Sequence, residues 1–306
     1  MQSLISDPVP MTADRQEAYL LRLRRQFPFV YVKTLTRTAF GRRVCALQLG
    51  AGSRKVLLTA GHHANECITS DALWQWLFTY CGVVLRGGRI GGADARELYH
   101  NSMVYLVPLV NPDGADLAAG VLPPDSLEYR AAARIAAQHP DIPFPSGWKR
   151  NLRGVDQTLN APARWELARR IKKEQGVSGP APRDFVGFSP LDQPETAALA
   201  AFTCCIHPDV MLALHTQGSV IYPGPAETAP PGSDTLAAAF SAASGYPVEP
   251  VPPESANAGF KDWFLQRFHR PAFTIEAGIG ENPLPQSQLP EICQALCGVF
   301  TAALSW

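Results

Sequence analysis

Residues 56–66, VLLTAGHHANE, run from an apolar strand pattern into a turn of small residues that carries two histidines and a glutamate. Imidazole nitrogens and carboxylate oxygens bind Zn²⁺, and catalytic zinc sites commonly use three protein ligands and keep one position open. His63 and Glu66 form the pattern H-x-x-E. This pattern is weak by itself because it occurs by chance in many proteins, and His62 stays an alternative ligand on the pattern alone.

Two further strand patterns end in residues of the same kind. Residues 210–218, VMLALHTQG, place His215 after an apolar run, and residues 272–278, AFTIEAG, place Glu276 in the same way. Ligand-binding groups of open α/β sheets gather at the carboxyl ends of strands. In the alternative interpretation His215 caps a strand, Glu276 pairs with a surface arginine and His63 is an ordinary turn residue. That interpretation requires several coincidences at once, so the sequence favours a single site.

The rest of the chain predicts an α/β fold. Apolar or β-branched runs predict strands at residues 29–33, 44–49, 55–59, 103–110, 210–214 and 272–275. Helical spacing predicts helices at residues 12–27, 69–80, 193–203, 234–244, 260–268 and 286–303. Because several strands are almost continuously apolar, we expect a mixed sheet covered by helices on both faces. The stretches rich in proline and glycine are read as ordered loops or lids (residues 139–147, 175–187 and 222–232).

Composition excludes several function classes. The chain has 306 residues, of which 46% are hydrophobic, and its 27 basic and 27 acidic residues cancel. A chain of this size buries a substantial core, and without a repeat or a low-complexity linker we expect a single catalytic domain over residues 1–306. The charge balance predicts no nucleic-acid partner. No window approaches the roughly 20 apolar residues of a membrane span, and the start does not resemble a secretory signal, so we expect a cytoplasmic protein without a membrane partner.

The seven cysteines are odd in number and lack paired C-x-x-C spacing. They are therefore predicted to be reduced thiols, mostly in the core. Cys293 and Cys297 lie four residues apart on a predicted helix. This spacing fits an apolar helix face, and half of a metal site stays open as the alternative.

Six blocks in order along the chain resemble the zinc carboxypeptidase family, and more closely its bacterial branch of γ-D-glutamyl-diamino-acid peptidases, which act on cell-wall peptides. The blocks are GHHANE (61–66), VPLVNPDGADL (107–117), PSGWKRNLRGVD (145–156), LALHTQG (212–218), AGFKDWF (258–264) and FTIEAGIGENPLP (273–285). The resemblance implies a carboxypeptidase-like fold with a mixed sheet of roughly eight strands flanked by helices. It also implies a zinc-dependent peptidase that hydrolyses the γ-D-glutamyl to diaminopimelate amide bond of muropeptides.

The resemblance also assigns roles to residues. It implies one zinc ion per chain held by His63, Glu66 and His215. The resemblance therefore identifies His63, and not His62, as the zinc ligand. The general base, which takes a proton from the metal-activated water, falls on Glu276. The resemblance further places the arginine that polarises the scissile carbonyl at Arg153, and the carboxylate that hydrogen-bonds a zinc-ligating histidine at Asp156.

Substrate contacts are the least specified part of the resemblance. Candidates for binding the peptide are Arg150, Thr158, Gln217 and Gly278. Arg164 and Arg183 are further candidates for binding the carboxylates of a diamino-acid substrate. In the digestive carboxypeptidases an Asn-Arg pair follows the GVD motif and binds the C-terminal carboxylate, whereas residues 157–160 are QTLN here. The leucine-asparagine pair usual in the diamino-acid branch is also absent, and residues 254–260 contain no counterpart of the family's substrate-capping tyrosine.

Two alternatives to the muropeptide peptidase stay open. A carboxypeptidase or amidohydrolase acting on other peptides or on N-acyl amino acids would use the same metal site and Glu276 with another pocket. A non-catalytic peptide-binding protein would keep the fold alone. The string Asn111-Pro112-Asp113-Gly114 is interpreted as a structural turn near the site, and the oligomeric state is not predicted.

Overall fold

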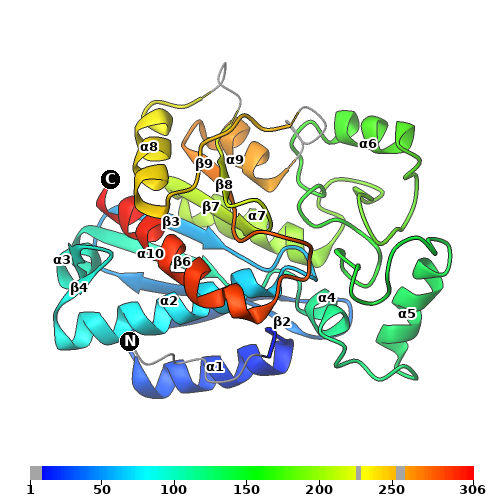
Figure 1. Cartoon of the computed structure of the whole chain (residues 1–306), viewed down its shortest axis with the longest axis horizontal. Coiled ribbons are helices and arrows are strands. Elements are labelled where there is room, and N and C mark those ends of the chain that lie inside the picture. Colours follow the sequence, from blue (N-terminus) through cyan, green and yellow to red (C-terminus); the bar gives the residue numbers. More distant parts are fainter. Residues whose placement is uncertain (1–8, 225–228, 253–258) are drawn as a thin grey trace.

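The computed structural model describes residues 9–224, 229–252 and 259–306, and its centre is a seven-stranded mixed sheet (Figure 1). Across the sheet the order is β1 (Tyr31–Arg37), β2 (Arg43–Gly50), β6 (Ser102–Val107), β3 (Arg54–Thr59), β7 (Val210–His215), β9 (Ala272–Glu276) and β8 (Val220–Tyr222). Strands β6, β3, β7 and β9 are mutually parallel, while the β1–β2, β2–β6 and β8–β9 pairs are antiparallel. The four central strands therefore end at the same edge.

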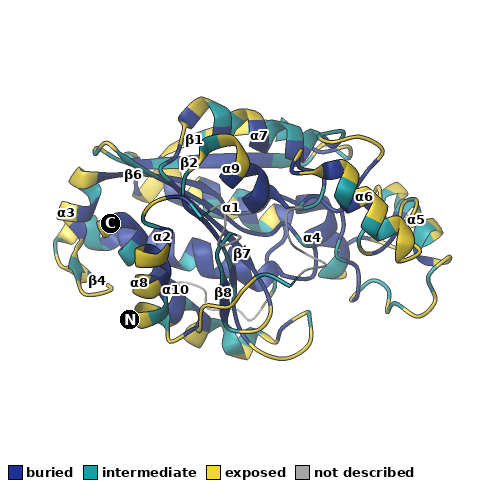
Figure 2. Cartoon of the chain, turned by 90° about the horizontal axis from the view of Figure 1, so that it is seen from above, coloured by how far each residue is buried: buried dark blue, intermediate teal, exposed yellow. Residues whose placement is uncertain are grey.

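Helices cover both faces of this sheet, and the strands supply apolar side chains to each (Figure 2). One face packs against α1 (Ala13–Gln26), α2 (Cys67–Arg86), α3 (Ala95–Asn101), α8 (Ser233–Ser244) and α10 (Leu289–Ser305). The other face packs against α7 (Pro194–Ile206) and α9 (Phe260–Phe268). In β3, Val56 and Leu58 join the first core and Leu57 joins the second. This arrangement explains why the strand sequences are continuously apolar.

A third group of elements lies beyond the carboxyl edge of the sheet, toward the right of Figure 1. It contains α4 (Pro112–Ala118), α5 (Leu127–Ala136), α6 (Trp165–Glu174) and the loops between them. Small apolar clusters of its own hold it in place, and fully buried Trp148 belongs to one of them. The Trp148 indole donates to the carbonyl of Arg150 at 2.8 Å. Residues of these loops line one side of a cavity above the sheet edge.

The predicted fold class is confirmed, with differences in detail. The main sheet has seven strands rather than about eight, and β4 (Arg89–Ile90) and β5 (Ala93–Asp94) form a separate two-stranded sheet. The strand expected at residues 103–110 ends at Val107, because Pro108 has no amide hydrogen for the ladder. The string that starts at Asn111 is a helix start rather than an isolated turn: the Asn111 side chain caps α4 by accepting from the Gly114 amide at 3.0 Å.

Other predictions concern thiols, membranes and lids. Each of the seven cysteines is a free thiol, and Cys293 and Cys297 pack against the main core from α10, as expected of a helix face. Within the described parts of the chain, no helix has both the length and the apolar character needed to cross a membrane. Residues 254–260 contain no capping tyrosine, and positions 253–258 of this region lie outside the described residues. Positions 225–228 of the predicted loop 222–232 also lie outside them.

Candidate active site

The carboxyl edge of the sheet brings together the residues that the strand patterns singled out. His215 is the last residue of β7, Glu276 is the last residue of β9, and the two are register partners. The turn that carries His63 and Glu66 follows β3, the other parallel neighbour of β7. The chain therefore presents two histidines and two glutamates at one place.

The turn after β3 is fixed by its glycine and by backbone hydrogen bonds. Gly61 has φ +63°, and a Cβ there would lie 2.5 Å from the Ser70 hydroxyl and 2.7 Å from the Leu109 side chain, so only glycine fits. The Asn111 amide donates to the Gly61 carbonyl at 2.9 Å, and the Ala64 amide donates to the Lys149 carbonyl at 2.9 Å. These bonds hold the turn against both α4 and the 145–156 segment.

His63, Glu66 and His215 form a compact group that could hold a metal ion. Their ligand atoms all lie within 4.8 Å of one another. The Glu66 carboxylate lies 2.8 Å from His63 Nδ1 and 3.0 Å from His215 Nδ1, and it is almost fully buried. Two imidazoles and one carboxylate are a suitable donor set for catalytic zinc. His62 is not in this group, since its Nε2 lies 2.9 Å from the Thr59 hydroxyl.

The charges of the group favour metal binding. Burial alone raises the pKa of the Glu66 carboxyl, but the charges of His63 and Lys149 hold that pKa well below its usual value. Burial lowers the pKa of His215, which keeps its imidazole in the neutral form that binds metals. For His63 the lowering by burial is outweighed by the neighbouring carboxylates of Glu66 and Asp156, and its pKa is raised. Glu66 is therefore a carboxylate ready to bind a cation.

Asp156 holds His63 from the other side. Its Oδ1 lies 3.5 Å from His63 Nε2, while His63 Nδ1 points toward Glu66. Burial raises the pKa of the Asp156 carboxyl, but the Arg150 guanidinium 2.5 Å away and His63 hold it well below its usual range. Asp156 also accepts from the Thr158 amide at 2.9 Å. A carboxylate so fixed orients a metal-binding imidazole.

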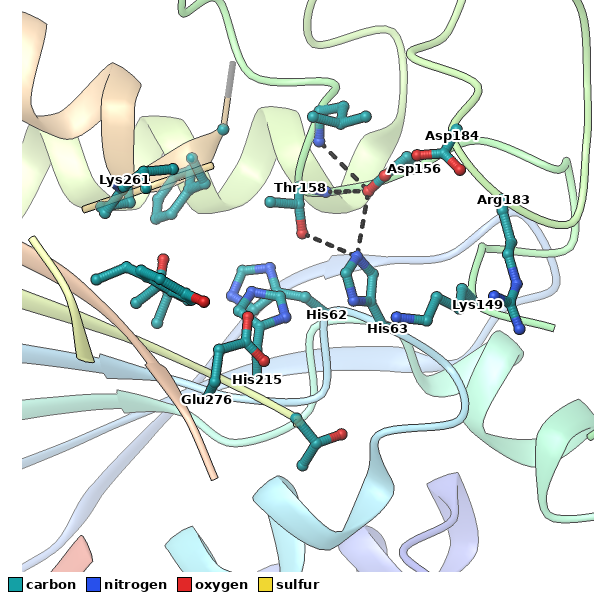
Figure 3. Close-up of a pocket in the computed structure, with 18 of the residues that line it drawn as sticks. His62, His63, Lys149, Asp156, Thr158, Arg183, Asp184, His215, Lys261 and Glu276 are labelled. Carbon is teal, nitrogen blue, oxygen red and sulfur yellow. Dashed lines mark hydrogen bonds and ion pairs between the residues drawn. The ribbon is translucent and has the colours of Figure 1, made fainter. Parts of the chain in front are cut away.

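Glu276 lines the same cavity and is not a member of the metal-binding group (Figure 3). Burial, together with the nearby charge of Glu66, raises the pKa of its carboxyl to about 8. A carboxyl group with a pKa near neutrality exchanges protons efficiently at working pH. The carboxylate lies beside His215 in Figure 3, in a position to act on a molecule bound at the metal group.

The cavity has a volume of about 460 Å³, and its walls carry charged side chains on two sides of the histidines. On one side lie Lys149, Arg150, Lys172 and Arg183 with Asp184; on the α9 side lies Lys261 with Asp262. Figure 3 shows Lys261 on one side of His215 and Glu276, and Lys149 and Arg183 on the other. The pocket therefore suits a charged rather than an apolar ligand.

The structure does not bring every predicted residue to the cavity. Arg153 is exposed and is not among the described residues that line the cavity; its charge acts on buried Glu195 of α7 instead. Gly278 is not among the described residues that line the cavity either. With φ +74°, and with the Leu284 side chain 2.5 Å from where its Cβ would stand, Gly278 serves a tight turn. Thr158, Gln217, Arg150 and Arg183 do line the cavity, whereas Arg164 precedes α6 outside its lining.

Lys149 is the cation that sequence reasoning missed. Its Nζ lies 2.9 Å from the Glu66 carboxylate, and its backbone amide donates to the Pro182 carbonyl at 3.1 Å. The only sequence signal for Lys149 was its position in the 145–156 block. That block also contains Arg150 and Arg153, and the sequence alone did not show which of the three cations faces the metal-binding group. The fold places this lysine beside the metal-binding group.

Comparison with known proteins agrees with this geometry. Residues 16–297 match the zinc carboxypeptidase family, and the chain belongs to that family. It is accordingly a hydrolase of the zinc metallopeptidase class. The chain is 38% identical over 283 residues to gamma-D-glutamyl-L-diamino acid endopeptidase 1 of Lysinibacillus sphaericus, an alignment that covers 92% of this chain and 69% of that protein. The resemblance found in the sequence is thereby confirmed.

Solved structures share the fold at low sequence identity. Bovine thrombin-activatable fibrinolysis inhibitor superposes with a TM-score of 0.68 at 16% identity, over 97% of this chain and 96% of that one. Murein-tripeptide amidase MpaA from Escherichia coli O157 superposes with a TM-score of 0.53 at 20% identity, over 90% and 92% of the two chains. These similarities establish the carboxypeptidase-like fold.

Proposed function

We propose that this protein hydrolyses the amide bond between γ-D-glutamate and a diamino acid, most specifically diaminopimelate, in cell-wall peptides. The observation that carries the proposal is the compact group of His63, Glu66 and His215 in a cavity with one wall rich in cations, which are Lys149, Arg150, Lys172 and Arg183. A γ-D-glutamyl-diaminopimelate peptide carries several carboxylates, which such a wall attracts. The name of the Lysinibacillus sphaericus relative supports the same substrate class.

In this proposal His63, Glu66 and His215 hold one zinc ion, which supplies a Lewis acid that polarises the scissile carbonyl and acidifies water. Glu276 takes the proton of the attacking water and passes it to the leaving amine. Asp156 keeps the His63 ring oriented, and the Arg150 guanidinium fixes Asp156 in turn. Each role uses a side chain that lines the cavity or contacts the metal-binding group.

The cation that stabilises the developing oxyanion is Lys149 in this proposal, in place of Arg153. Lys149 contacts the metal-binding group and lines the cavity, whereas Arg153 is exposed away from it. A fixed positive charge beside the reacting carbonyl acts in a partly dry site, where it is worth far more than in water. The hydrogen bond from the Ala64 amide to the Lys149 carbonyl holds the backbone of Lys149 beside the turn that carries His63.

Replacing Lys149 with methionine is expected to lower kcat by about 10²- to 10³-fold, the usual effect of removing one oxyanion-stabilising donor. Arg153→Met is the matched control and is expected to leave kcat within about 2-fold, because surface substitutions of this kind change little. Steady-state kinetics on one peptide substrate measures both. A large loss in Arg153→Met with a small one in Lys149→Met would return the role to Arg153.

The substrate class is tested with zinc-loaded protein and two peptides, L-Ala-γ-D-Glu-meso-diaminopimelate and a conventional peptide ending in phenylalanine. Mass spectrometry is expected to show cleavage of the first alone, between glutamate and diaminopimelate. Cleavage of the conventional peptide instead would favour a carboxypeptidase acting on other peptides. Binding of either peptide without any cleavage would favour a non-catalytic protein.

We also propose that the protein acts in the cytoplasm, on imported or recycled wall fragments. All seven cysteines are free thiols, which suits a reducing compartment. Fractionation of the host cells checks this placement, and recovery of the native protein outside the cell contradicts it.

A further inference from the structure

The backbone amide of Thr216 is one of the groups that hold the Glu66 carboxylate in place. Its N–H donates to Glu66 Oε2 at 3.2 Å. The Lys149 ammonium also contacts Glu66 from outside the metal-binding group, but it does so through a flexible side chain that is 21% exposed. Hydrogen bonds from such outer groups orient a carboxylate that binds a metal. Whatever fixes the Thr216 backbone therefore acts on the metal-binding group.

Asn282 fixes Thr216 through two hydrogen bonds. Asn282 Nδ2 donates to the Thr216 carbonyl at 3.1 Å, and the Thr216 hydroxyl donates to Asn282 Oδ1 at 2.7 Å. A carbonyl oxygen only accepts, so the amide nitrogen of Asn282 has to face it, and the hydroxyl then supplies the proton of the second bond. The N–H, C=O and O–H groups of Thr216 are thus each paired, and the residue is buried.

This pair joins the two strand ends of the site. Thr216 follows His215 at the end of β7, and Asn282 lies on the loop that follows Glu276 at the end of β9. The Ala277 amide holds the peptide group before Thr216, since it donates to the His215 carbonyl at 2.8 Å. Asn282 holds the peptide group after Thr216. Asn282 is therefore the part of this arrangement that a side-chain substitution can remove.

We propose that Thr216 and Asn282 are positioning residues that keep Glu66 in the orientation that binds zinc. The contacts run from the Asn282 side chain to Thr216, and from the Thr216 amide to Glu66. This inference rests on the zinc site of the proposed function and not on its substrate. Because Asn282 belongs to the loop after Glu276, the pair also ties the segment that follows the general base to a metal ligand.

The test measures zinc affinity in three variants by competition with a chelator of known affinity. Thr216→Val keeps the shape and the backbone amide of the residue and removes the hydroxyl, and Asn282→Leu removes both bonds to Thr216 without adding charge. Both variants are expected to bind zinc about 10-fold more weakly, the lower end of the effect of groups that orient metal ligands. Thr216→Ser keeps the hydrogen bond and is expected to stay within about 2-fold of the unmodified protein.

Thr203→Val is the matched control. It also removes a buried threonine hydroxyl, which donates to the Leu199 carbonyl at 2.8 Å in α7, outside the described lining of the cavity. It is expected to lower the Tm of the metal-free protein as Thr216→Val does, and to leave zinc affinity unchanged. Zinc affinity that falls equally in Thr203→Val, or that is unchanged in Thr216→Val and Asn282→Leu, would mean that the pair only stabilises the turn after β7, and would overturn the inference.

A double variant tests whether the two side chains act as one link. Thr216→Val combined with Asn282→Leu is expected to bind zinc as well as Asn282→Leu alone, because effects of contacting residues are not additive. Fully additive losses would contradict the link. Competition with a chelator needs no substrate, so weakened zinc binding supports the inference even if no peptide is cleaved, an outcome in which only the proposed function fails. Unchanged zinc binding overturns the inference even if the diaminopimelate peptide is cleaved.

Discussion

Replacing Glu276 with glutamine is expected to lower kcat by about 10²- to 10⁴-fold while zinc content and KM stay close to those of the unmodified protein. Glutamine keeps the shape of the side chain and cannot accept a proton from water. Glu276 is not part of the metal-binding group, so the metal is retained. Steady-state kinetics together with elemental analysis of the purified variant measure both quantities.

The charge state of Glu276 is consistent with this role. Burial and the charge of Glu66 raise the pKa of its carboxyl to about 8. A cation held by His63, Glu66 and His215 acts in the opposite direction, because a nearby positive charge favours the ionised form. Loading the site with metal therefore shifts Glu276 toward the carboxylate that a general base requires.

A matched substitution controls the experiment. Glu281→Gln makes the same change on the loop that follows β9, at an exposed residue outside the described lining of the cavity. It is expected to leave kcat within about 2-fold, as surface changes usually do. If Glu276→Gln retained most of its activity, the base would have to be another group; if it lost its zinc, the carboxylate would be a ligand instead.

The strand ends were the part of the site that sequence reasoning could predict. His215 and Glu276 each close an apolar run, and His63 follows another, so parallel pairing of these strands sufficed to bring them together. The choice of His63 over His62 needed more than the pattern, since both follow Gly61. In the fold the His62 ring packs on His215 and bonds to Thr59, while His63 faces Glu66.

Residues in irregular segments were harder to assign. Lys149, Arg150 and Arg153 lie within one short segment that has no helical or strand period, so the sequence does not say which side chain faces the cavity. Their directions are set by contacts with distant segments, such as the bond from Lys149 to Pro182 and the ion pair of Arg150 with Asp184. The sequence alone therefore did not show which of these cations lies beside the metal-binding group.

Short elements were missed for a related reason. Strand β8 has three residues and helix α6 has ten, in a region where proline and glycine are frequent. Too few positions repeat in such segments for a period to be recognised. Gly278 illustrates the same limit at one residue: its position beside Glu276 made it a candidate for substrate contact, and only the packing of Leu284 against it reveals a turn.

Replacing Glu66 with glutamine is expected to abolish activity and to weaken zinc binding by more than about 100-fold. Changes to groups that only orient a ligand typically cost 10- to 100-fold in metal affinity, and loss of a ligand costs more. Asp156→Asn provides the comparison, since Asp156 contacts His63 without joining the metal-binding group, and its loss is expected to fall within about 10- to 100-fold. Competition with a chelator of known affinity ranks the three proteins.

Thermal unfolding gives an independent measurement of the same site. Ligands that bind only the folded state stabilise it, by about 4 kcal/mol at a thousand times the dissociation constant. Added zinc is therefore expected to raise the Tm of the unmodified protein by several degrees and that of Glu66→Gln hardly at all. The metal-free protein is expected to stay folded, because the two cores that cover the sheet are built from apolar side chains. A Tm that responds to zinc equally in both proteins would place the metal elsewhere.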